Sequence, residues 1–124
     1  AEPAGFDDTT RSLASGTREK VQPGAKSWCD ALLAATPGEI TFPINRRTLK
    51  GGFAVSDDEV ARAMAAAFAH LKLVVEPGGA VALAAVLAGR IDARDQCLIV
   101  VCSGGNVDPE VFAQALQRAV LAKN

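Results

Sequence analysis

The chain has 124 residues, of which 49% are hydrophobic and 22% charged, and its formal net charge is −1 at pH 7. This composition excludes a disordered chain and fits one domain with one packed core. The near-neutral charge and the lack of a basic run exclude a nucleic-acid partner, because phosphate binding needs clustered Lys and Arg. No apolar run approaches about 20 residues, so no transmembrane helix and no membrane partner are expected.

The cysteines and the N-terminus indicate the compartment. Cys29, Cys97 and Cys102 form no C-x-x-C pair. An odd number of cysteines fits a reduced, cytoplasmic protein better than a disulfide scaffold or a zinc site. The first residues lack the basic and apolar parts of a signal peptide, and they include no initiator Met. We expect a cytoplasmic protein and a chain that begins inside a longer sequence.

The first half of the chain predicts short elements. A short helix is predicted over 8–14, ended by Gly16. Gly, Ser, Gln and Pro over 15–24 indicate a loop, and a second helix is predicted over 26–34. A short strand is predicted over 53–55.

The second half carries stronger patterns. Ser56 and Glu59 form a capping box, and apolar residues at helical spacing extend a helix from about 57 to 72. An Ala-rich helix is predicted over 80–87. Residues 96–102 (QCLIVVC) read as a strand buried on both faces. A last helix follows Asp108, with Pro109 in its first position.

These elements indicate an α/β fold with an open, mostly parallel sheet and flanking helices. The chain ends with a β-α unit, in which a strand leads through the loop Ser103–Asn106 into a helix. Ligands of such sheets bind at the carboxyl ends of strands, near helix N-termini. The loop is therefore the first place to look for a site, although it also reads as a tight connection capped by Asp108.

Acidic residues mark two further candidate sites. Glu76 ends an apolar run, where it could face a polar ligand or serve as a loop acid before a helix. Glu2, Asp7 and Asp8 lie around a tight turn, and such carboxylates together with a backbone carbonyl suit a hard divalent cation. The alternative for Asp7 or Asp8 is capping of the helix that follows.

Residues 70–89 (HLKLVVEPGGAVALAAVLAG) and 98–112 (LIVVCSGGNVDPEVF) resemble the C-terminal part of pyridoxal-phosphate-dependent threonine dehydratases and of the related serine racemases. Residues 2–16, 30–46 and 55–64 match in the same order. The resemblance implies the large domain of a fold-type II pyridoxal-phosphate enzyme. In that family a lysine near the N-terminus binds the cofactor, and none of the five lysines here lies in the corresponding motif. Residues 1–124 are thus expected to be one incomplete, C-terminal part of the cofactor-binding domain.

The resemblance assigns roles to individual residues. Ser103 matches the serine whose hydroxyl meets the pyridine nitrogen of the cofactor, and Gly104 adjoins it. Glu76 matches a glutamate beside the cofactor ring. Ala31 falls where the family often has a glycine on the substrate side, so the match departs from the pattern there.

Two further sites are implied by the resemblance. Glu2, the backbone carbonyl of Phe6, and Asp8 match a divalent-cation site, for Mg²⁺ or Ca²⁺. Lys72 and Asn106 match positions near an effector-nucleotide site at a dimer interface.

The implied function is deamination of L-threonine, and of L-serine, to a 2-oxo acid and ammonia, within a longer homo-oligomeric enzyme. This chain alone is expected to be inactive. Serine racemase or another hydroxy-amino-acid dehydratase is the alternative inside the family. A non-enzymatic binding module is the alternative outside it.

Overall fold

The computed structural model describes residues 1–121. Its helices and strands are, in chain order, β1 (Glu2–Pro3), α1 (Asp8–Ser15), α2 (Thr41–Thr48), β2 (Ala54–Val55), α3 (Asp57–Ala66), α4 (Pro77–Leu87) and α5 (Pro109–Leu121). Single 3₁₀ turns cover Ala4–Phe6 and Asp30–Leu32, and a π-helical turn over Ala67–Leu71 prolongs α3. Each of the helices in this part of the chain is too short or too polar to cross a membrane.

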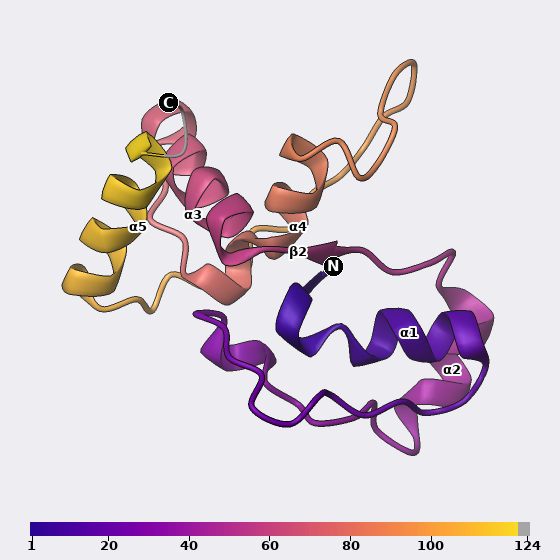
Figure 1. The fold of residues 1–124 in the computed structure, drawn as a ribbon. Coiled ribbons are helices and arrows are strands. Elements are labelled where there is room, and N and C mark those ends of the chain that lie inside the picture. The colour runs from indigo at the N-terminus through magenta and orange to yellow at the C-terminus, as the bar shows by residue number, and fades with distance from the viewer. Residues whose placement is uncertain (122–124) are drawn as a thin grey trace.

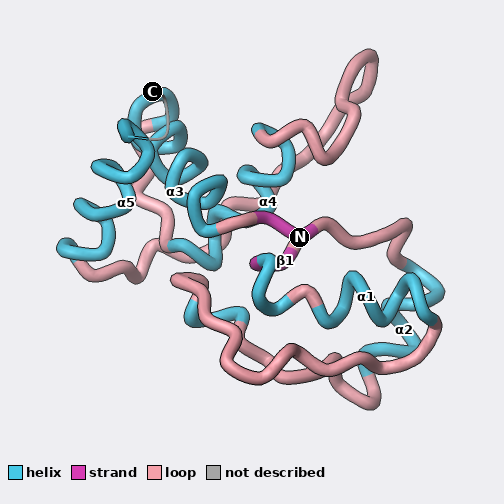
Figure 2. Tube along the Cα trace, viewed as in Figure 1, coloured by secondary structure: helices cyan, strands magenta, loops and turns pink. Residues whose placement is uncertain are grey.

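The two strands form a small parallel sheet in the middle of the molecule (Figure 2). Glu2 lies opposite Ala54 and Pro3 lies opposite Val55. Helices α3, α4 and α5 gather on one side of this pair, whereas α1 and α2 lie on the other (Figure 1). The predicted α/β class, with a parallel sheet and flanking helices, is confirmed.

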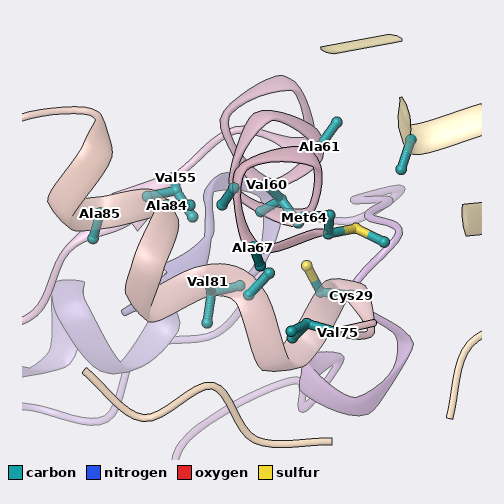
Figure 3. Close-up of a cluster of buried hydrophobic side chains, with 13 residues drawn as sticks. Cys29, Val55, Val60, Ala61, Met64, Ala67, Val75, Val81, Ala84 and Ala85 are labelled. Atoms are coloured by element: carbon teal, nitrogen blue, oxygen red, sulfur yellow. The ribbon is translucent and has the colours of Figure 1, made fainter. Parts of the chain in front are cut away.

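The core lies where α3 packs against α4 and α5, and small side chains allow these helices to approach closely. Figure 3 shows Met64 and Cys29 pointing into the same cluster. The buried cluster consists of Cys29, Val55, Val60, Ala61, Ala63, Met64, Ala67, Val75, Ala80, Val81, Ala84, Ala85 and Ala115.

Local capping chemistry accounts for the confirmed helix ends. The Ser56 hydroxyl accepts from the Glu59 amide at 3.2 Å, and the Glu59 carboxylate accepts from the Ser56 amide at 2.7 Å. Gly16 ends α1 in the left-handed region, with φ of 77°. Helix α5 begins at Pro109, as predicted, whereas α4 begins at Pro77, earlier than predicted.

The strand predicted over 96–102 is wrong. This segment is extended but belongs to neither strand of the described sheet, and Ile99 and Val101 are 87% and 68% exposed. A strand needs a neighbour that accepts its backbone hydrogen bonds. Among residues 1–121, no neighbour pairs with this segment.

Two predictions in the first half also fail in detail. The helix predicted over 26–34 is reduced to the 3₁₀ turn at Asp30–Leu32, because the Ser27 hydroxyl and the Trp28 amide bond to Asp57 instead. Helix α2 was not predicted, since Pro43 reads as a helix breaker. In the structure Pro43 lies in the first turn of α2, where proline is tolerated.

Burial of Cys29 leads to a prediction at alkaline pH. Burial raises the pKa of its thiol from 9.0 to about 11. The unfolded chain releases this proton first, so the free energy of unfolding should fall as pH rises from about 9 to 11, by about 2–3 kcal/mol. Denaturant titrations should show this loss in the wild type and in Cys97→Ala, whose thiol is exposed, but not in Cys29→Ala. Equal slopes in all three proteins would contradict it.

Candidate functional site

The N-terminus of α4 and the loop 103–106 form the centre of the candidate site. The backbone amide of Glu76 donates to the carbonyl of Gly104 at 3.2 Å. In return the Glu76 carboxylate accepts from the backbone amide of Asn106 at 3.0 Å. Glu76 therefore holds the loop from both its backbone and its side chain.

Glycines make this approach possible. A Cβ at Gly79 would overlap the carbonyl oxygen of Ser103. A Cβ at Gly104, where φ is 79°, would lie 2.5 Å from the Glu76 carboxyl group. The glycines of both motifs thus bring the loop and the helix into direct backbone contact.

The turn 27–32 approaches the same helix end from another direction. A Cβ at Gly78 would lie 3.3 Å from the Ala31 Cβ, so Ala31 packs directly on the first turn of α4. A cavity of about 380 Å³ separates the turn, α4 and the loop. Its lining residues are Trp28, Asp30, Pro77, Asn106, Val107, Asp108, Val111 and Gln114.

The structure therefore gathers the predicted cofactor residues around one helix end. Glu76 lies directly beneath Gly104, Ser103 is exposed on the loop, and Ala31 contacts α4 from the turn. The importance of Gly79 and Trp28 was not predicted. Only the second glycine of EPGGA offered a sequence signal for Gly79, and nothing local indicated that Trp28 lines the cavity.

The predicted cation residues lie at the start of α1. The Glu2 carboxylate accepts from the Thr9 amide at 3.2 Å, from the Thr10 amide at 2.7 Å and from the Thr10 hydroxyl at 2.7 Å. Glu2 thus occupies the favourable N-terminal end of α1. Its oxygens retain lone pairs for a cation, since a carboxylate accepts about four bonds.

Asp8 is buried beside Glu2, with 4% of its surface exposed. Burial raises the pKa of its carboxyl above the usual value, and the charges of Glu2 and Asp7 raise it further. Within residues 1–121 no three His, Cys, Asp or Glu side chains are arranged to bind a metal. The predicted site has only two carboxylates and the Phe6 carbonyl, so it is of a different kind.

The predicted effector residues are exposed and separate in their contacts. Lys72 follows the π-helical turn with φ of 59°, and its ammonium donates to the Ala69 carbonyl at 2.7 Å. Asn106 bonds to Glu76 through its backbone. In the described part of the chain, no hydrogen bond joins Lys72 to Asn106.

A larger cavity of about 510 Å³ lies between α3, α4 and α5. Its walls are mostly alanine and leucine, with Glu59, Arg62 and His70 among them, and they contain none of the predicted site residues. The chemistry-bearing groups gather at the smaller cavity.

Comparison with known proteins agrees with this arrangement. The family described as "Pyridoxal-phosphate dependent enzyme" matches residues 1–103, which include all the segments that meet at α4. The chain belongs to this family of pyridoxal-phosphate-dependent enzymes, and its structural neighbours are of fold type II.

Individual relatives narrow the comparison. The chain is 40% identical over 118 residues to a serine racemase of Dictyostelium discoideum, covering 94% of this chain and 36% of that protein. It is 30% identical over 110 residues to an L-threonine ammonia-lyase of Thermotoga maritima, covering 89% and 27% respectively. The structure of maize serine racemase superposes with a TM-score of 0.80 at 32% identity, covering 95% of this chain and 38% of that one. The crystal structure of a bacterial-type threonine deaminase ("T.th.") superposes with a TM-score of 0.79 at 39% identity, covering 86% and 38%. The chain thus spans about a third of the length of these relatives.

Proposed function

We propose that the chain is the C-terminal part of the cofactor-binding domain of an enzyme that deaminates L-threonine, and L-serine, to the 2-oxo acid and ammonia. The observation that carries this proposal is the meeting of Glu76, Ser103 and Gly104 at the N-terminus of α4. Relatives named threonine ammonia-lyase and threonine deaminase support the substrate.

The residues present fit pyridoxal phosphate. A cavity of about 380 Å³ falls within the range of small-molecule sites. The Ser103 hydroxyl, exposed on the loop, suits a pyridine nitrogen because it can donate or accept. When bound, the cofactor supplies an electron sink for the substrate carbon that loses its proton.

The chain's own residues orient the ring and set its charge. Ser103 offers a neutral partner to the ring nitrogen, which leaves that nitrogen largely unprotonated and favours loss of the β-hydroxyl group. Glu76 holds Ser103 and its loop in place, and Ala31 forms the wall on the substrate side. A lysine from another part of the protein takes the α-proton.

The direct test uses the complete protein encoded by the gene that contains this chain. We expect it to bind pyridoxal phosphate and to release ammonia and 2-oxobutanoate from L-threonine in a steady-state assay. Residues 1–124 alone should show neither activity. Turnover of threonine by residues 1–124 alone, or a complete protein that binds no pyridoxal phosphate, would refute the proposal.

Serine racemase is the second candidate, because the Dictyostelium discoideum relative carries that name. The same assay with L-serine separates the two activities: a racemase forms D-serine, whereas the dehydratase forms pyruvate and ammonia. D-serine as the main product would favour this second function.

We further propose that Glu2, the Phe6 carbonyl and Asp8 bind Mg²⁺ or Ca²⁺. All three donors are oxygens, as hard cations require. The buried Asp8 carboxyl beside Glu2 is costly without a counter-charge, which a cation would supply.

Asp8→Asn tests the cation site. The raised pKa of Asp8 means that the folded state holds its proton more tightly, so this residue costs stability as pH rises above about 4. With a chelator at neutral pH, Asp8→Asn should therefore melt at or above the wild-type temperature. Added Mg²⁺ or Ca²⁺ should stabilise only the wild type, because a ligand stabilises the state that binds it. Equal responses of both proteins to the cation would leave Asp8 as a helix-terminal residue only.

Homo-oligomerisation, a cytoplasmic location and effector binding near Lys72 and Asn106 complete the proposal. They rest on the resemblance to the family and on the exposure of both side chains. Titration of the complete protein with a nucleotide, monitored in the wild type and in Lys72→Ala, tests the effector site.

A further inference from the structure

The turn 27–32, which we call the Trp28 turn, is attached to the N-terminus of α3. The Ser27 hydroxyl donates to the Asp57 carboxylate at 2.7 Å, and the Trp28 amide lies 3.4 Å from both carboxylate oxygens. The Ser27 hydroxyl also accepts from the Cys29 amide at 3.1 Å. Asp57 therefore fixes the first residues of the turn.

Helix α5 holds the Trp28 ring itself. The guanidinium carbon of Arg118 lies 4.7 Å from the ring centroid, within the range of a cation–π contact. Arg118 also pairs with the Asp58 carboxylate of α3. The ring is thereby tied to the two helices that form the core with α4.

The far end of the same turn forms a wall of the candidate site. Cys29 is fully buried in the core, and the Leu32 amide donates to the Cys29 carbonyl at 2.8 Å. Ala31 and Leu32 pack on Gly78 in the first turn of α4. Trp28 lines the 380 Å³ cavity together with Pro77. An unbroken series of contacts thus leads from Asp57 and Arg118 to the wall carried by Ala31.

We propose that Trp28 is a positioning residue: held by Asp57 and Arg118, it fixes the Trp28 turn so that Ala31 closes the substrate side of the cofactor site. This inference rests on the proposed function for the identity of the ligand. The contacts that carry it lie outside the residues to which the resemblance assigns a role.

The test compares Trp28→Ala with Phe112→Ala in the complete protein. Phe112 also packs against the core from α5, where its ring lies 5.5 Å from that of Phe68, so its loss is a matched control for a lost aromatic side chain. We expect Trp28→Ala to raise the Kd for pyridoxal phosphate and the KM for the amino acid about tenfold more than Phe112→Ala does. Trp28→Phe, which keeps an aromatic face, should stay within about threefold of the wild type. Equal increases in Kd for Trp28→Ala and Phe112→Ala, in proportion to their loss of Tm, would overturn the proposal.

A second measurement requires no cofactor. Hydrogen exchange should become at least about tenfold faster in the Trp28 turn in Trp28→Ala, and should be unchanged there in Phe112→Ala. If Trp28→Ala fails to fold, Arg118→Lys serves instead, because it keeps the charge beside Asp58 but loses the planar group over the ring. Unchanged exchange in the variant would overturn the positioning role. Faster exchange in a complete protein that binds no pyridoxal phosphate would instead refute the proposed function and leave the anchoring of the turn intact.

Discussion

Gly79→Ala should lower the free energy of unfolding by about 1–3 kcal/mol and abolish tight binding of pyridoxal phosphate by the complete protein. The added Cβ would overlap the Ser103 carbonyl, which is backbone and cannot rotate away. Alanine otherwise favours a helix over glycine by about 1 kcal/mol, so any loss of stability occurs against this intrinsic preference. The loop that carries the Ser103 hydroxyl would have to move away from α4. Denaturant unfolding and a cofactor titration measure the two effects.

Two other glycines provide graded controls. A Cβ at Gly51 would meet nothing within 4 Å, so Gly51→Ala should leave stability and cofactor affinity unchanged. Gly78→Ala should have a smaller effect than Gly79→Ala, because its Cβ would lie 3.3 Å from the Ala31 methyl group. If Gly79→Ala behaves like Gly51→Ala, the close approach of loop and helix does not matter to the site.

Glu76→Ala should weaken binding of pyridoxal phosphate by about 10- to 100-fold. The substitution removes the carboxylate that accepts from the Asn106 amide, and a hydrogen bond to a charged group contributes about 1.5–3 kcal/mol. The loop 103–106 would then lose its side-chain attachment to α4, and the Ser103 hydroxyl would no longer be held in one place. An equilibrium titration, followed by the visible absorbance of the bound cofactor, measures the change.

Glu76→Gln separates the hydrogen bond from the charge. The amide oxygen can still accept from Asn106, so its affinity should stay within about threefold of the wild type. Glu39→Ala is the surface control, because Glu39 is 83% exposed in its pair with Arg18 and such pairs contribute about 0–1 kcal/mol. An equally large loss of affinity in Glu76→Gln would show that the charge of Glu76, and not its contact with the loop, is what the site requires.

Sequence reasoning succeeded where short-range chemistry decides the structure. The capping box of Ser56 and Glu59 satisfies backbone groups within a few residues, and so do the turn at Gly16 and Pro109 at the start of α5. The spacing of EPGGA and SGGN carried the resemblance, and the family match confirmed it. These features depend on neighbouring residues and are therefore legible in the sequence.

Where contacts between distant segments decide, the sequence alone was insufficient. Residues 96–102 have the composition of a buried strand, but strand pairing depends on a neighbour, and in the described part of the chain none lies beside them. The helix predicted over 26–34 gave way to bonds with Asp57, about 30 positions along the chain. Helix α2 forms although its sequence contains proline, since Pro43 falls in the first turn.

The candidate site divides in the same way. The sequence by itself determined which residues carry chemistry, because Glu76 and Ser103 stand in recognisable motifs. Only the tertiary structure decided that Ala31 and Trp28 join them, since contacts between residues separated by about 45 or more positions depend on how α3, α4 and α5 pack. Helix propensity and capping act over one turn, whereas the wall of a cavity is assembled by the burial of apolar surface from the whole domain.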